Sequence, residues 1–222
     1  MSTETVVLGA ILTALVVVLQ LMGAFIRLGP FSISLVLIPI VIGAATCGPW
    51  ISAWLGLVFG VAVLLSGDAA LFLAVDIPGT IITVLAKGFA CGLGAGLAYK
   101  AVLELLDKRS QRHIQTIKST SGLCEACEGG VYRFISRNNK YIAVLVSAIV
   151  CPLLNTGVFL LGCVVFFMET VASWAAAAGL GGGVGHYMIF GLVGANFLFE
   201  LGMNIILSPV IVRLLNIKSK QL

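Results

Sequence analysis

Six long apolar stretches make up most of this 222-residue chain, and they limit the solvents in which it can fold. They cover about residues 5–26, 33–47, 50–66, 76–106, 140–168 and 187–215. Several reach the roughly 20 residues that a helix needs to cross the hydrocarbon core of a bilayer. Because lipid cannot hydrogen-bond the backbone, such segments must form helices or a closed barrel, and continuous apolar runs favour helices. We predict an all-α membrane protein, a six-transmembrane-helix bundle in a single domain, 1–222.

Composition agrees with this prediction. The mean hydropathy is +1.14 and only 10% of the residues are charged. The second and third apolar stretches are short and are separated only by Thr46-Cys47-Gly48-Pro49, which predicts a helix-breaking turn. Whether these two helices span the bilayer fully stays open at this stage.

The basic residues predict how the chain is oriented. Eleven of the thirteen lie in one polar loop, its flanks and the C-terminal tail: Lys100, Lys108, Arg109, Arg112, Lys118, Arg133, Arg137, Lys140, Arg213, Lys218 and Lys220. Because cytoplasmic loops carry an excess of Lys and Arg, this loop and tail are expected to be cytoplasmic. An even number of helices then places both termini in the cytoplasm. Topology explains the net charge of +4, so we expect no nucleic-acid partner.

The polar loop, about residues 108–139, has no apolar periodicity and is interpreted as a surface linker. It contains Cys124 and Cys127 in a CxxC arrangement, with His113 as the nearest other metal ligand. A structural zinc site normally uses four ligands, so we expect no metal site. The loop from Glu169 to Tyr187 is glycine- and alanine-rich, which is equally typical of a partly helical lid and of a simple connector.

Polar residues inside the apolar stretches indicate where function lies. Lys87 is about ten residues into the fourth stretch, a depth at which it needs a partner or a wet cavity. The candidate partners are Glu200 and an anionic group of a ligand. Asn196, Glu200 and Asn204 recur every four residues and form one polar stripe, which must face the inside of the bundle. We expect Asn196 to contact ligand and Glu200 and Asn204, joined by Asn155, to give buried polar support.

Two small-residue patterns predict close helix packing. Gly88, Gly92 and Gly96 form a smooth groove for a neighbouring helix. Ala10 and Ala14 share one face of the first helix, and spacing alone favours packing inside the bundle.

We do not expect an enzyme. The chain has only two histidines, and neither a nucleotide-binding loop nor a hydrolase motif is present. His186 is better interpreted as an interfacial residue or as a ligand contact.

The chain resembles the substrate-binding S components of energy-coupling factor (ECF) vitamin transporters. The resemblance covers essentially the whole chain and rests on the six-helix topology with both ends cytoplasmic and on three sequence features. These features are the Ala10-xxx-Ala14 pair, the segment from Leu37-Ile38-Pro39-Ile40 through Cys47-Gly48-Pro49, and the terminal Asn204-Ile205-Ile206-Leu207-Ser208-Pro209.

The resemblance implies a prokaryotic plasma-membrane protein that binds a vitamin with high affinity and uses no cofactor itself. Its partners would be a transmembrane coupling protein, which docks on Ala10 and Ala14, and two cytoplasmic ATPases that use ATP. The implied substrate-binding residues are Arg27, Lys87, Trp174, His186, Tyr187 and Asn196.

Arg27 and Lys87 favour a ligand with a carboxylate, which points to pantothenate, with folate and riboflavin as other candidates. The alternative function is a stand-alone channel or facilitator for a small polar solute.

Overall fold

The computed structural model describes residues 3–23, 27–28, 31–32, 35–121, 125–179 and 183–218, without the side chains at 27–28, 31–32, 114, 116–121, 125–133, 214 and 216–218. In chain order its elements are α1 (Thr3–Gly23), β1 (Arg27–Leu28), β2 (Phe31–Ser32), α2 (Leu37–Cys47), α3 (Pro49–Leu65), α4 (Ala70–Leu73), α5 (Ile77–Ser121), α6 (Glu125–Phe166), α7 (Met168–Ala177), α8 (Gly183–His186), the π-helix η1 (Tyr187–Val193) and α9 (Gly194–Lys218). The two short strands pair in antiparallel fashion, Arg27 with Ser32 and Leu28 with Phe31.

Apart from this short hairpin, the described chain is a helical membrane protein, and each of the six apolar stretches contains a helix. Of the helices in the described ranges, four are long and apolar enough to cross a bilayer, at Thr3–Gly23, Ile77–His113, Phe134–Phe166 and Gly183–Arg213. The helices α2 and α3 are shorter, with 11 and 17 residues. At 1.5 Å per residue, α2 extends only about 17 Å, too little to cross the hydrocarbon core alone.

The predicted turn between α2 and α3 is confirmed. Gly48 has φ 92°, a left-handed conformation that glycine adopts without steric cost, and it follows the last residue of α2. Pro49 is the first residue of α3, where its missing N–H leaves no helix hydrogen bond unmade. The chain therefore reverses within a single residue.

The predicted glycine groove of α5 is also confirmed, and its partner is α3. A Cβ atom at Gly88 would overlap the carbonyl oxygen of Gly56, and one at Gly92 would overlap that of Ser52. The two backbones are therefore in direct contact, as small residues allow in membrane helices. This contact fixes the register of α5 against α3, and α5 carries Lys87.

Residues 108–139, interpreted from the sequence as a polar loop and surface linker, are helical in the part that the structure describes. Both α5 and α6 continue as helices into this segment, and they have 45 and 42 residues. Asn139 joins them at the base of the hairpin by donating to Asp107 Oδ1 at 2.8 Å and to Ser110 Oγ at 3.1 Å. Residues 98–121 contain many good helix formers and no glycine or proline, and extending an existing helix needs no new nucleus. Polarity alone was therefore a poor indicator of a loop. Cys124 lies outside the described residues.

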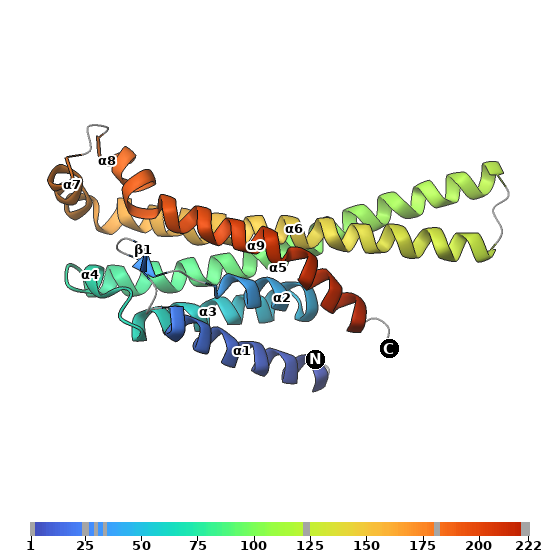
Figure 1. Ribbon diagram of the computed structural model, residues 1–222, viewed down its shortest axis with the longest axis horizontal. Coiled ribbons are helices and arrows are strands. Elements are labelled where there is room, and N and C mark those ends of the chain that lie inside the picture. The colour runs from blue at the N-terminus through green and yellow to red at the C-terminus, as the bar shows by residue number, and fades with distance from the viewer. Residues whose placement is uncertain are drawn as a thin grey trace.

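The bundle has two distinct ends (Figure 1). The elements α4, α7 and α8 and the β1–β2 hairpin lie at one end, whereas the α5–α6 hairpin projects beyond the other. The first turn of α1 and the last turn of α9 both point toward the end with the hairpin. The connection after α6 contains α7 and α8, so it is partly helical, which the sequence had left open.

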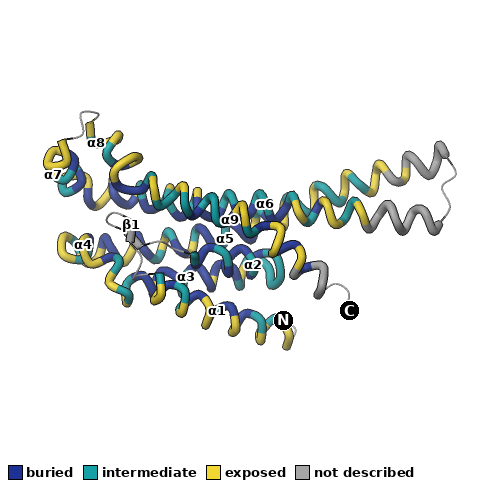
Figure 2. The backbone as a smooth tube through the Cα atoms, in the orientation of Figure 1, coloured by how far each residue is buried: buried dark blue, intermediate teal, exposed yellow. Residues whose placement is uncertain are grey.

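Exposed residues lie along the outer surfaces of the helices, and buried residues line the centre (Figure 2). Many of the exposed residues have large apolar side chains. In α1 the buried side comprises Gly9, Leu12, Val16 and Gln20. Such an apolar exterior suits a protein whose solvent is lipid.

Candidate functional site

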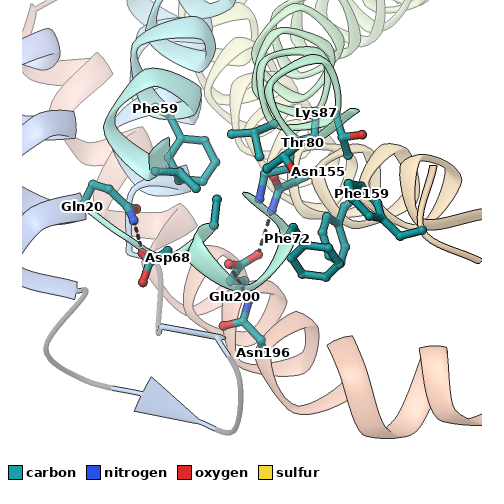
Figure 3. A pocket seen from close by; sticks show the side chains of 15 residues that line it. Gln20, Phe59, Asp68, Phe72, Thr80, Lys87, Asn155, Phe159, Asn196 and Glu200 are labelled. Carbon is teal, nitrogen blue, oxygen red and sulfur yellow. Dashed lines mark hydrogen bonds between the residues drawn. The ribbon is translucent and has the colours of Figure 1, made fainter. Parts of the chain in front are cut away.

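The described residues enclose a polar cavity at the end of the bundle that carries α4 (Figure 3). Six helices and two connections supply its walls. The lining residues are Gln20 of α1; Phe59 and Val63 of α3; Asp68 and Ala69; Phe72 of α4; Thr80, Thr83, Val84 and Lys87 of α5; Asn155 and Phe159 of α6; Phe167; and Asn196 and Glu200 of α9. The cavity has a volume of about 60 Å³, which is room for a few water molecules.

A second hollow adjoins this cavity. It offers about 40 Å³ and shares Lys87, Asn155, Phe159 and Asn196 with the first. These four side chains therefore line both the cavity and the second hollow.

Lys87 lies where α5 passes between two phenylalanine rings. Its Nζ atom is 5.6 Å from the centroid of the Phe59 ring and 5.4 Å from that of the Phe159 ring. Both distances are within the range of cation–π attraction. Within the described part of the chain, no carboxylate oxygen lies within 4 Å of Nζ, since the ion pair found there joins Lys100 and Glu104. The Lys87 ammonium group is therefore held by aromatic faces, with its hydrogen-bond donors left for other groups.

Glu200 sits on the opposite wall and is only 2% exposed. The Nδ2 atom of Asn196 donates to Glu200 Oε1 at 3.0 Å, and that of Asn155 donates to Glu200 Oε2 at 3.4 Å. One turn deeper, Asn204 donates to the Glu200 backbone carbonyl at 3.0 Å. The predicted polar stripe of α9 thus faces inward, as confirmed by its burial, and Asn155 joins it.

Asp68 connects α1 to the segment between α3 and α4. Its Oδ2 atom accepts hydrogen bonds from Gln20 Nε2 at 2.5 Å and from Ser66 Oγ at 3.1 Å. Gln20 is buried, although it lies in an otherwise apolar helix. This contact closes the side of the cavity that faces α1.

Three hydrogen-bonding atoms of the cavity wall, Thr83 Oγ1, Asn155 Oδ1 and Asn196 Oδ1, have no partner among the residues that the structure describes. Buried polar atoms are nearly always satisfied, because leaving one unpaired costs about 1–3 kcal/mol. All three are acceptors, and the hydroxyl can also donate. They therefore indicate a place where water or a ligand completes the hydrogen bonding.

An aromatic cluster covers the same cavity. The Phe72 ring meets Phe159, Phe167 and Trp174 edge to face, with centroids 5.5, 5.1 and 5.5 Å apart. The short helix α4 is thereby packed against α6 and α7. Any ligand that enters from this end must displace part of this cluster.

The structure places the predicted substrate-binding residues in two groups. Lys87 and Asn196 line the cavity. Trp174 and Tyr187 instead pack against the apolar cluster that includes Phe72, Phe159 and Phe167 and covers the cavity. His186 is exposed, and the centroid of its ring is 4.7 Å from that of Phe190. The side chain of Arg27 lies outside the described residues. That any of these residues binds a ligand stays a prediction.

Several cavity residues escaped the sequence interpretation. Gln20 carried a signal, since an amide inside an apolar helix needs a partner. Thr83 did as well, because it lies four residues before Lys87 and shares its helix face. Phe59, Phe72 and Phe159 carried none, because single aromatic residues are common in apolar segments. Their role depends on the tertiary packing.

The cavity has the chemistry of a binding site. It combines one ammonium group, two carboxylates and unpaired acceptors with aromatic walls. Neither histidine lines it. Among known proteins, the chain matches the family described as ECF transporter, substrate-specific component, over residues 4–212. No curated protein and no solved structure matched the chain. Because the match covers nearly the whole length, the chain belongs to the substrate-specific components of ECF transporters.

Proposed function

We propose that this chain captures a water-soluble vitamin or related micronutrient with high affinity, as a binding subunit of an ECF importer. The observation that carries the proposal is the polar cavity around Lys87, with its three unpaired acceptors inside an apolar bundle. Such atoms are costly to keep buried unless a ligand satisfies them. The chain itself needs no cofactor in this role, and ATP is used by partner ATPases.

The proposed topology has six membrane helices with both termini in the cytoplasm of a prokaryotic cell. The positions of α1 and α9 support it, since both chain ends lie toward the hairpin end of the bundle (Figure 1). That hairpin carries Lys108, Arg109 and Arg112. By the positive-inside rule the cavity then opens toward the outside. In this topology α2 and α3 also cross the membrane. Neighbouring helices cover part of their surfaces, so these two short helices do not face lipid on all sides.

The proposed docking surface for the coupling protein is the face of α1 that carries Ala10 and Ala14. Both residues are exposed, so they do not pack inside the bundle. Val7, Val18 and Leu21 are exposed around them. A small-residue patch within an apolar surface allows another membrane helix to approach closely.

The second candidate function, a channel, has weaker support. Below Glu200, the side chains of Asn204 and Ser208 are buried and donate to backbone carbonyls of their own helix. Neither residue lines the two hollows around Lys87. The polar stripe of α9 thus ends in packed protein, which favours a closed binding site.

A thermal-shift screen of detergent-purified protein against water-soluble vitamins tests the proposal. The panel includes pantothenate, folate and riboflavin. A ligand at 1,000 times its Kd adds about 4 kcal/mol to the native state, so a nanomolar binder gives a large shift at micromolar concentration. We expect one compound or one chemical class to stabilise the protein. A flat response across the panel would contradict a vitamin-binding role.

A further inference from the structure

Lys87 shares its cavity with the carboxyl groups of Asp68 and Glu200, so the protein itself supplies acidic partners for this amine. Glu200 lines this cavity from α9, and Asp68 lines it from the segment between α3 and α4. Asn155 and Asn196 both donate hydrogen bonds to the Glu200 carboxylate. The cavity thus holds one amine and two carboxyl groups. An anionic ligand at Lys87 would therefore add an uncompensated negative charge to a largely enclosed site.

The unpaired atoms of the cavity wall also disfavour an anionic ligand. Asn155 is 5% exposed and Thr83 is 4% exposed, and each has an oxygen without a partner in the described protein. Together with Asn196 Oδ1, they present acceptors to the cavity. A ligand carboxylate brings no donor to the two amide oxygens, Asn155 Oδ1 and Asn196 Oδ1, and its negative charge is repelled by them. A ligand with N–H or O–H groups satisfies them directly.

The walls between these polar atoms are aromatic. Phe59 and Phe159 flank the Lys87 ammonium group, and Phe72 closes the space toward α4. Flat walls of this kind suit a planar ring. Lys87 can donate to a ring nitrogen or a carbonyl oxygen, and neither requires a net charge on the ligand.

We propose that this cavity selects an uncharged, planar ligand that carries N–H or O–H donors and an acceptor for Lys87. The inference deepens the proposed function and rests on it. It departs from the sequence-based expectation of a carboxylate, because the structure places Glu200, the other candidate partner of Lys87, in the same cavity together with Asp68 and the unpaired acceptors.

Matched pairs of compounds test the inference, because the members of each pair differ in one charged group. Suitable planar pairs are nicotinamide and nicotinate, and riboflavin and its 5′-phosphate; pantothenol and pantothenate form a pair without a planar ring. Binding of each to the full-length purified protein is measured by thermal shift and then by calorimetry. In any pair that binds, the uncharged member is expected to bind at least about tenfold more tightly, given the size of charge interactions in such sites.

The outcomes separate the two proposals. Tighter binding of the anionic member, or equal binding of both, would overturn the charge inference and leave the vitamin-binding function intact. A flat response to every pair and to the wider panel would remove the function, and this inference with it.

Glu200→Gln provides a second test, because a purely structural role of Glu200 would leave the preference for the uncharged member of each pair unchanged. The amide keeps the shape of the side chain but removes one of the two carboxyl groups that share the cavity with Lys87. The preference for the uncharged member is expected to shrink by about tenfold or to reverse. Glu104→Gln is the matched control, because Glu104 is exposed and lies outside the cavity. An unchanged preference in a folded Glu200→Gln protein would contradict the inference.

Discussion

Replacing Ala10 and Ala14 together with tryptophan is expected to abolish uptake and to leave substrate binding unchanged. Both alanines are on the exposed face of α1, away from the residues that this helix buries. Two indole rings would hold a partner helix several ångströms away, and membrane helices associate through close van der Waals contact. Uptake is measured in cells that also produce the coupling protein and the ATPases, and binding is measured on purified protein.

Leu161→Trp with Val165→Trp is the control for this experiment. These residues have the same four-residue spacing and are 64% and 70% exposed on α6. The control adds the same aromatic bulk to a different lipid-facing surface, so it is expected to transport normally. Normal uptake by the α1 variant would show that the coupling protein docks elsewhere.

Lys87→Met is expected to weaken substrate binding by roughly 10- to 100-fold, the usual cost of losing a hydrogen bond from a charged group. Methionine keeps most of the volume between Phe59 and Phe159 but removes the donor and the positive charge. It also leaves Glu200 without its balancing cation, which lowers stability. Affinity for the strongest binder of the vitamin panel is measured by calorimetry.

The double variant Lys87→Met with Glu200→Gln removes both charges, so it separates binding from folding. Its stability is expected to exceed that of Lys87→Met, while its binding stays weak. Lys100→Met is the surface control, since Lys100 is 63% exposed and pairs only with Glu104 at 3.9 Å. Full affinity in Lys87→Met would place the substrate elsewhere.

The sequence predicted most of the helices, because the bilayer imposes strong rules on composition. Long apolar runs, the Gly48-Pro49 break and the glycine groove of α5 are local patterns with one physical outcome each. The helical extension of α5 and α6 was missed, because helix propensity and continuity outweighed the lack of an apolar face. A polar segment that follows a membrane helix without glycine or proline is better interpreted as helix.

The cavity was predicted only in part, because its walls come from segments far apart in the chain. Lys87, Asn196, Glu200 and Asn155 were identified since polar groups in lipid must find partners. The contribution of Phe72 depends on how α4 folds back over α6, which no local pattern encodes. Upstream of Asn196, seven residues form a π-helix, so an α-helical projection of the stripe misplaces the side chains from Tyr187 to Val193.

Transport by the reconstituted protein tests the central claim most directly. The purified chain is placed in liposomes alone and together with its coupling protein and ATPases, and uptake of labelled substrate is followed with and without ATP. We predict that the chain alone binds substrate but does not move it, and that accumulation requires the full complex and ATP. Substrate flux through the chain alone, without ATP, would contradict this account and identify the protein as a channel.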